Sequence, residues 1–306
     1  MAQTDPAAAG RQAALLAGLA NEGISSTNTD ILFRWVFPDI NNLNTTPDYP
    51  GQAKNLVNGL ASLSSPQVLF ASCYPTMQNL LNNTSSIPII YAGLFHDDTG
   101  GGTPPNSSFG NNVGGIYSHQ FDVCAQWVAL LKVVLPELQA IAVIYDGTNT
   151  GAADKYVSWI QKAAGAIPLT KITINLNITQ ANIQAQLTNF LKGGNTTANS
   201  GLIVPAGALI ANWRSIIIQL VNALKLPAIY PNRMYIENSP PGFMSCGAVL
   251  LDQYLIAGLA VANTYKAGGG FKSFTTRNTN WETIVSQSQA TALGFTSIPP
   301  NAVVVA

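Results

Sequence analysis

The chain has 306 residues, a length that favours two domains of about 150 residues each. Hydrophobic residues make up 47% of it, which excludes global disorder, and 14 basic residues balance 14 acidic ones. This balance excludes the strongly basic surface of a protein that binds nucleic acid or an anionic membrane. Charged residues total only 9%, against about 25% in ordinary soluble domains. The low value indicates either a compositional bias of the lineage or adaptation to acid outside the cell.

Strands and helices alternate through the first third of the chain. The pattern predicts helices over 6–20, 50–63 and 76–83, and strands over 31–35, 67–72 and 87–93. The segment 98–112 is rich in glycine, proline and asparagine, which predicts a loop. Alternation of apolar strands with helices of about a dozen residues is typical of a mostly parallel sheet covered on both faces.

A second alternation follows. Strands are predicted over 140–146, 169–176, 201–207 and 226–230, with helices over 126–136, 152–165, 179–193 and 209–224 between them. The small residues of MSCG (244–247) predict a turn, a helix follows over 248–268, and the mixed tail ends in the strand-like AVVVA (302–306). We predict that this end pairs with a sheet.

The two alternations predict an α/β protein with two Rossmann-like lobes and mostly parallel sheets. Lobe 1 is expected to comprise 1–116 plus 246–278, and lobe 2 to comprise 117–245 plus 279–306. Ligands of open α/β sheets bind outside the carboxyl ends of the strands. A ligand is therefore expected between the lobes, at those ends.

Several segments resemble one family. The run LPAIYPNR…PPGFMSCGAVLLDQY (226–254), the segments NNVGGIY and IPIIYAG, and TNWETIVSQSQATALGFTSIPP (279–300) are similar, in order, to blocks of the bacterial ABC-transporter substrate-binding proteins. That family includes receptors for aromatic amino acids. The resemblance covers nearly the whole chain and implies a periplasmic-binding type I fold with a hinge, an ABC permease as partner and an extracytoplasmic location.

The chain also departs from that family's pattern. It starts at the first helix, without the strand that precedes it in the family, and this strand is central to the sheet of lobe 1. The acidic residue usual in the segment matching Val204–Gly207 is absent, because the chain reads PAG there. The tyrosine of the family's MSYG is Cys246. The resemblance therefore implies the fold more strongly than it implies the ligand.

The expected strand ends supply the candidate ligand-binding residues, which share polar, aromatic or anion-binding character. An aromatic ring or imidazole can stack on a planar ligand, a carboxylate can take an amine, and free backbone N–H groups can take an anion. The candidates are Ser72, Cys73, Tyr74, Thr76, Phe95, His96, Asp97, Asp146, Thr148, Asn149, Tyr230, Arg233, Tyr235 and Ser245.

Several candidates also have a simpler structural interpretation. Thr76 can be a helix N-cap, the residues from Phe95 to Asp98 a solvated loop, and Asp146 part of an Asp-Gly turn. Arg233 can either clamp a ligand carboxylate or form an ion pair with Glu237 four residues later.

Cysteine and histidine chemistry is sparse. Cys73, Cys124 and Cys246 allow at most one disulfide, and a bond between Cys73 and Cys246 requires their Cα atoms to lie within about 7 Å. The two histidines, His96 and His119, are too few for a histidine-based metal cluster. No nucleophile–base motif, phosphate-binding loop or metal spacing is present, so we expect neither a cofactor nor catalysis.

Six sequons mark potential N-glycosylation sites, at Asn44, Asn82, Asn83, Asn106, Asn177 and Asn195. No apolar run reaches the roughly 18 residues of a membrane span, and the residues AQTDPAAAG after Met1 do not read as the apolar region of a signal peptide.

Two functions are weighed. The first is an extracytoplasmic solute-binding protein that captures a small molecule, an amino acid or an aromatic acid, for an ABC importer. The second is a structural subunit of an extracellular assembly that is derived from the same fold, with strand donation between subunits. Low charge, the missing strand and the strand-like end of the chain favour this alternative, in which copies of the chain would associate through Ala302–Ala306.

Overall fold

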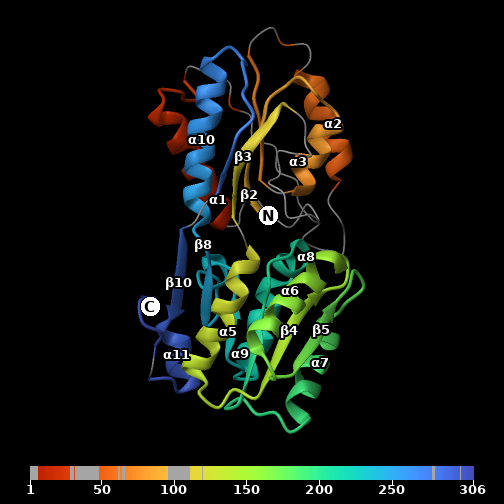
Figure 1. The fold of residues 1–306 in the computed structure, drawn as a ribbon, viewed down its shortest axis with the longest axis vertical. Helices are drawn as coiled ribbons and strands as arrows, with labels where there is room; N and C mark the ends of the chain where they lie inside the picture. The colour runs from red at the N-terminus through yellow and green to blue at the C-terminus, as the bar shows by residue number, and fades with distance from the viewer. Residues whose placement is uncertain are drawn as a thin grey trace. The chain divides into compact units, whose positions relative to one another are not determined.

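The computed structural model describes residues 6–27, 31, 48–60, 63, 66–72, 74–95, 111–118, 120–277, 280–296 and 298–306 (Figure 1). The described part of the chain forms two compact units. Unit 1 contains the described residues up to 118 together with 249–277, and unit 2 contains 120–248 together with those from 280 onward. The predicted strand over 31–35 lies outside the described residues except for Ile31, and the loop over 98–112 does so except for its last two residues.

Unit 1 is built on a four-stranded parallel sheet with the strand order β1-β2-β3-β9. Helices α1 and α10 pack together on one face, and α2 and α3 lie on the other (Figure 1). The strands are β1 (Leu69–Ala71), β2 (Ile89–Phe95), β3 (Val113–Ser118) and β9 (Thr275–Arg277), and the helices are α1 (Pro6–Asn21), α2 (Tyr49–Leu60), α3 (Tyr74–Leu81) and α10 (Leu250–Lys266).

Strand β2 shows why the sheet of unit 1 needs helices on both faces. Ile89 and Tyr91 pack in the cluster of α2 and α3, whereas Ile90 and Ala92 pack in the cluster of α1 and α10. Successive side chains of a strand point to opposite faces. All four residues are fully buried, as the continuous apolar run in the sequence predicts.

Unit 2 is built on a seven-stranded sheet with the order β11-β10-β8-β7-β6-β4-β5, in which only β8 and β10 pair antiparallel. The strands are β4 (Ala140–Asp146), β5 (Leu169–Ile174), β6 (Ser200–Ile203), β7 (Ala228–Tyr230), β8 (Met244–Ala248), β10 (Trp281–Ser286) and β11 (Val303–Val305). The helices are α5 (Val123–Val134), α6 (Thr150–Ala164), α7 (Gln180–Lys192), α8 (Ala208–Asn212), α9 (Arg214–Ala223) and α11 (Gln287–Leu293), with 3-10 turns η2 (Gln120–Asp122) and η3 (Arg233–Tyr235).

Two predictions for unit 2 are wrong in detail. MSCG is not a turn but part of the fully buried strand β8, so Cys246–Ala248 belong to unit 2 and not to the first lobe. Small side chains here serve close packing, because a Cβ on Gly247 would lie 1.8 Å from the carbonyl oxygen of Pro231. The single helix predicted over 209–224 is divided at Trp213, whose backbone (φ −85°, ψ 3°) departs from helical geometry.

The C-terminal segment pairs with a sheet, as predicted. Val303–Val305 form β11, which pairs parallel with Ile284–Ser286 of β10 in unit 2. The segment therefore extends the sheet of unit 2, and in this chain it does not fill a position in the sheet of unit 1. In the described part of unit 1, β1 is an edge strand.

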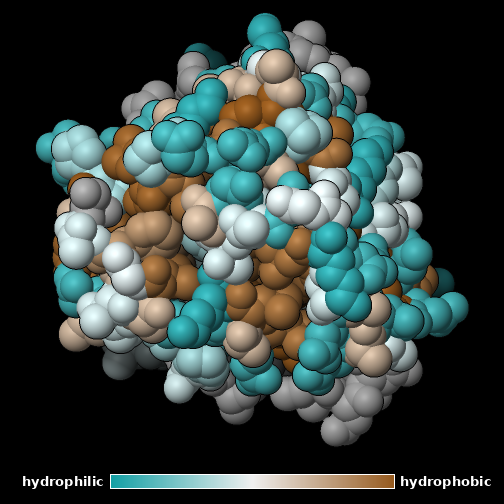
Figure 2. All heavy atoms as spheres, turned by 90° about the horizontal axis from the view of Figure 1, so that it is seen from below, coloured by the Kyte–Doolittle hydropathy of each residue, from teal (hydrophilic) through white to brown (hydrophobic). Residues whose placement is uncertain are grey.

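Some of the surface of the described residues is hydrophobic. Figure 2 shows hydrophobic surface divided by hydrophilic side chains on the face that it presents. Of the described residues, large hydrophobic side chains that are exposed include Val133, Trp159, Ile256, Val303 and Val304. No described helix is long and apolar enough to cross a membrane.

Candidate ligand-binding site

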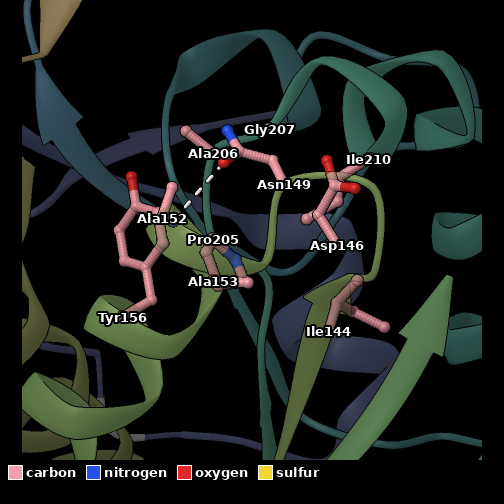
Figure 3. Close-up of a pocket in the computed structure, with 10 residues that line it drawn as sticks. All are labelled: Ile144, Asp146, Asn149, Ala152, Ala153, Tyr156, Pro205, Ala206, Gly207 and Ile210. Atoms are coloured by element: carbon pink, nitrogen blue, oxygen red, sulfur yellow. Dashed lines mark hydrogen bonds between the residues drawn. The ribbon is translucent and has the colours of Figure 1, made fainter. Parts of the chain in front are cut away.

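The described part of unit 2 contains a hollow at the carboxyl ends of β4 and β6 (Figure 3). The turns from β4 into α6 and from β6 into α8 form its rim. It spans about 240 Å³ of space between atoms, most of which is open solvent, so it is a shallow hollow and not an enclosed small-molecule pocket. Its lining consists of Ile144, Asp146, Asn149, Ala152, Ala153, Tyr156, Pro205, Ala206, Gly207 and Ile210.

Asp146 is the charged residue of the hollow. It ends β4, and only 6% of it is exposed. Its Oδ1 accepts hydrogen bonds from the backbone N–H of Thr148 at 2.9 Å and from the Thr148 hydroxyl at 2.5 Å. This local turn is typical of Asp, whose side chain bonds to the backbone two residues later. The Asp-Gly turn interpretation is therefore confirmed, and one carboxylate oxygen is committed to it.

Asn149 and Gly207 shape the rim. Asn149 is the N-cap of α6 and accepts from the backbone N–H of Ala152 at 3.4 Å. Gly207 precedes α8 in an extended conformation, and a Cβ built on it would lie 3.1 Å from Asp146 Oδ2 and 3.2 Å from Ile210. The absence of a side chain at Gly207 therefore leaves room beside the second carboxylate oxygen.

An aromatic group supports the other side of the hollow. Tyr156 of α6 lines the hollow (Figure 3) and contacts Phe121 and Trp127, at centroid distances of 4.6 Å and 6.0 Å. Trp127 is fixed in turn, because its Nε1 donates to the carbonyl oxygen of Cys246 at 2.7 Å. The sequence analysis did not select Tyr156 as a site residue, because it lies within a helix rather than at a strand end.

The segment after β7 lies in the interior of unit 2. The rings of Tyr230 and Tyr235 are at most 1% exposed and stack on each other, with centroids 5.1 Å apart. Burial raises the pKa of both phenols. Ser245, beside Tyr230 in the register of β7 and β8, is 1% exposed. In unit 2 taken by itself, these three candidates are core residues.

Arg233 forms ion pairs with two carboxylates of unit 2. Its Nε and Nη2 donate to both oxygens of Glu282 at 3.1 and 2.9 Å, and its Nη1 donates to Glu237 at 3.2 Å. The ion pair with Glu237 is confirmed, and the bidentate pair with Glu282 on β10 could not be found by sequence spacing. Hydrogen bonding to Glu282 raises the pKa of Arg233 above the ordinary value of an arginine side chain.

The strand ends of unit 1 contain fewer described candidates. Ser72 is exposed after β1, and Thr76 is the third residue of α3 rather than its N-cap. Tyr74 begins α3 and Phe95 ends β2, whereas Cys73, His96 and Asp97 lie outside the described residues.

A buried amide that the sequence analysis missed joins these strand ends. Gln253 of α10 is fully buried, accepts from the backbone N–H of Gly93 at 3.0 Å and donates to the Ser118 hydroxyl at 3.4 Å. Gly93 lies where the register between β2 and β3 shifts, and it takes a positive φ of 71°, a backbone conformation that favours glycine.

The described cysteines are buried rather than reactive. Cys124 and Cys246 are free thiols in the core of unit 2, and burial raises the pKa of each. No group of three His, Cys, Asp or Glu side chains in the described residues is placed to hold a metal ion.

The sequons differ in accessibility. Asn82 and Asn177 are exposed, whereas the amide nitrogens of Asn83 and Asn195 donate to the carbonyl oxygens of Asn79 and Phe190. Asn44 and Asn106 lie outside the described residues.

No protein-family model and no curated protein sequence matches the chain. Solved structures do match. An ABC domain from Streptococcus pneumonia in complex with L-Trp is 18% identical, with a TM-score of 0.74 over 99% of this chain and 97% of that one. An open, ligand-free substrate-binding protein with adhesive properties from Clostridium difficile is also 18% identical, with a TM-score of 0.67 over 98% and 95% of the two chains.

A carbohydrate transporter from Acidothermus cellulolyticus in complex with myo-inositol is 13% identical, with a TM-score of 0.57 over 96% and 94% of the two chains. At such low identities the likeness concerns the fold. The chain has the α/β fold of the type I periplasmic-binding proteins, as the sequence resemblance implied.

Proposed function

We propose that the chain is an extracytoplasmic solute-binding protein that captures a small molecule and delivers it to an ABC importer. The observation that carries the proposal is the hollow of unit 2, which lies at the carboxyl ends of parallel strands and contains the buried carboxylate of Asp146. Ligands of this sheet architecture bind at those ends. The similar structures that hold L-Trp and myo-inositol support a small, polar ligand.

The hollow is too small to hold a whole ligand, so it can form only one part of a ligand-binding site. Enclosure of the ligand between the two lobes, with contacts from the segments 72–76 and 230–235, remains a prediction from the sequence. Such a protein needs no cofactor, because capture requires only that the ligand prefers the closed state.

Native mass spectrometry of the protein as purified tests the proposal, followed by thermal-shift measurements with amino acids, aromatic acids and polyols. A ligand that binds the folded state raises its stability by about 2.7 kcal/mol at a concentration of 100 Kd. We expect one compound class to co-purify or to raise Tm. A protein that carries no small molecule and shows no shift with any class contradicts the proposal.

One observation favours the structural-subunit alternative. Strand β11 is the last strand of the described sheet of unit 2, its three residues are all valine, and Val303 and Val304 are 51% and 45% exposed. The opposite edge strand of this sheet is protected, because the Gln186 amide bonds both the N–H and the C=O of Thr173 on β5. An uncharged edge strand with no strand partner among the described residues is a template for strand pairing.

The partner that fits this edge is β11 of a second copy. Val304→Lys tests the alternative, because a lysine discourages edge pairing while β11 can still pair with β10. Light scattering and negative-stain microscopy should show assemblies for the natural chain and monomers for the variant. A natural chain that is monomeric at high concentration contradicts the subunit role.

A further inference from the structure

We propose that two copies of the chain pair through β11 about a two-fold axis, with the two strands antiparallel, and that this association closes at a dimer. The proposal rests on the self-association of the structural-subunit alternative, for which it specifies the geometry of the contact, and it does not depend on solute binding. A longer assembly would then need a second contact elsewhere on the chain.

Strand β11 lies at one end of the sheet of unit 2. It pairs with β10, and no further described strand pairs with it. Val303 and Val304 point to opposite faces of the sheet, because successive side chains of a strand alternate, and both are about half exposed. Strand β11 therefore offers a partner apolar side chains on both faces, together with an edge that no described strand occupies.

The chain around β11 carries almost no charge. Residues 280–306 include one charged residue, Glu282, and Arg233 pairs with it at 2.9 Å. The hydrophobic residues of this segment include Trp281 and Phe295, which are only partly buried. Like charges directly opposite each other destabilise a pair of strands. An uncharged valine strand meets its own copy without that repulsion, so a second copy is the partner that fits this edge.

The opposite edge of the same sheet is closed to pairing. Gln186 of α7 accepts from the backbone N–H of Thr173 on β5 at 2.8 Å and donates to the carbonyl oxygen of Thr173 at 3.0 Å. An added strand would need these two backbone groups. Lys171 of β5 is 45% exposed and adds a charge to this edge, which also discourages pairing. A head-to-tail contact between β11 of one copy and β5 of the next is therefore unavailable.

Pairing of β11 with itself fixes the symmetry of the contact. A contact between identical surfaces is two-fold symmetric and closes at two copies. The two-fold axis that joins two strands in one sheet is perpendicular to the sheet, so the strands run antiparallel. The register that pairs all three valines places Val304 opposite Val304 of the second copy, and Val303 opposite Val305. Cross-strand pairs of β-branched side chains in contact stabilise such a sheet.

Sedimentation velocity of the full chain over a range of concentrations tests the association. We expect a reversible dimer of twice the 32.3 kDa of one chain. Its dissociation constant should be about 30-fold higher or more in Val304→Lys, because a lysine discourages edge pairing. Val133→Lys is the matched control, because Val133 is 43% exposed on α5 of the same unit, and this variant should dimerise like the natural chain. Circular dichroism and Tm establish that each variant is folded.

Cysteine cross-linking tests the register, in a Cys73→Ser background in which the remaining natural thiols are buried. Opposed Cα atoms of antiparallel strands lie about 4.5–5.5 Å apart, within the range of about 4.4–6.8 Å that a disulfide spans. We expect oxidation to link two copies of Val304→Cys. It should also link Val303→Cys to Val305→Cys, but not Val303→Cys to itself.

Each contrary result overturns a stated part of the proposal. A natural chain that stays monomeric at high concentration overturns it and contradicts the structural-subunit alternative as well. Association that Val304→Lys does not weaken overturns the β11 contact and leaves that alternative intact. Cross-linking of Val303→Cys to itself overturns the register, and assemblies larger than a dimer that Val304→Lys dissociates overturn the closure at two copies. Solute binding should be equal in the natural chain and in Val304→Lys, so its absence in both contradicts the binding function alone.

Discussion

Gly18 of α1 and Gly258 of α10 are in direct backbone contact. A Cβ on Gly18 would lie 2.9 Å from the Cα of Gly258 and 2.2 Å from the carbonyl oxygen of Leu255, and a Cβ on Gly258 would lie 2.2 Å from that of Leu15. Backbone atoms at such distances cannot move aside as a flexible side chain can. The two helices pack this closely because both residues are glycine.

Gly258→Ala should therefore destabilise the protein. Alanine is ordinarily favoured over glycine in a helix by about 0.5–1 kcal/mol, but overpacking here should cost about 1–3 kcal/mol. Chemical denaturation monitored by circular dichroism measures the difference. Gly59→Ala on α2 is the control, since no atom of the described residues lies within 4 Å of a Cβ built there, and the stability of this variant should be equal or higher. A Gly258→Ala variant as stable as the natural chain would show that the helices can separate at no cost.

Arg233→Ala should lower stability rather than ligand affinity. The guanidinium holds Glu282, whose side chain is only 16% exposed, and Glu237. Because Arg233 itself is 40% exposed, solvent screening limits the loss to about 1 kcal/mol. Thermal denaturation measures it, with Lys266→Ala at the exposed Glu22 pair as the control. A ligand affinity that falls in Arg233→Ala while Tm stays constant would instead favour the carboxylate-clamp interpretation.

The alternation of continuous apolar runs with helical segments made the fold predictable from the sequence. Strands such as 87–93 and 140–146 read as continuous apolar runs, and the structure buries both faces of β2 and β4. MSCG was misread because small residues suit turns and also suit a strand packed against the backbone at Pro231. Local composition cannot separate these cases, because the deciding contact is distant in sequence.

The candidate site was predictable only in part. Asp146 and Asn149 follow a strand, and the structure places both at the hollow. Tyr230 and Tyr235 also follow a strand, but they stack in the interior of unit 2. Gly207 and Tyr156 carry no chemical signal in the sequence, because their part in the hollow depends on the pairing of β4 with β6 and on the packing of α6.

Deletion of Asn301–Ala306 should destabilise unit 2. The deletion removes β11 and exposes the edge of β10 at Ile284–Ser286, the residues that pair with Val303–Val305. Loss of a few backbone hydrogen bonds, each worth about 0.5–1.5 kcal/mol net, should lower the denaturation midpoint measurably. Val304→Lys is the control, since it retains the strand. A truncated chain that unfolds like the full chain would mean that β11 contributes nothing to the sheet.

Stability should fall in alkali. Burial raises the pKa of Tyr91, Tyr230, Tyr235, Cys124 and Cys246. Unfolded cysteine and tyrosine release their protons from about pH 8.5 and 10, while the folded protein keeps them. The unfolded state then binds fewer protons, so stability is fully present below those values and decreases as pH rises, by up to about 1.4 kcal/mol per pH unit for each group. Tm measured from pH 7 to 11 should decline above pH 9, and a flat profile contradicts the prediction.

Among the described sequons, Asn177 should be modified when the chain is secreted by a host that N-glycosylates, and Asn195 should not. Glycosylation forms a bond to the side-chain amide nitrogen. Asn177 is exposed two residues before Thr179, the N-cap of α7, whereas the amide nitrogen of Asn195 donates to the carbonyl oxygen of Phe190 at 2.8 Å. Peptide mass spectrometry measures occupancy at each position. Asn177→Gln should remove one glycan and Asn195→Gln none. Occupancy at Asn195 with none at Asn177 contradicts the prediction, because acceptor accessibility in the folded unit would then not decide which sequon is used.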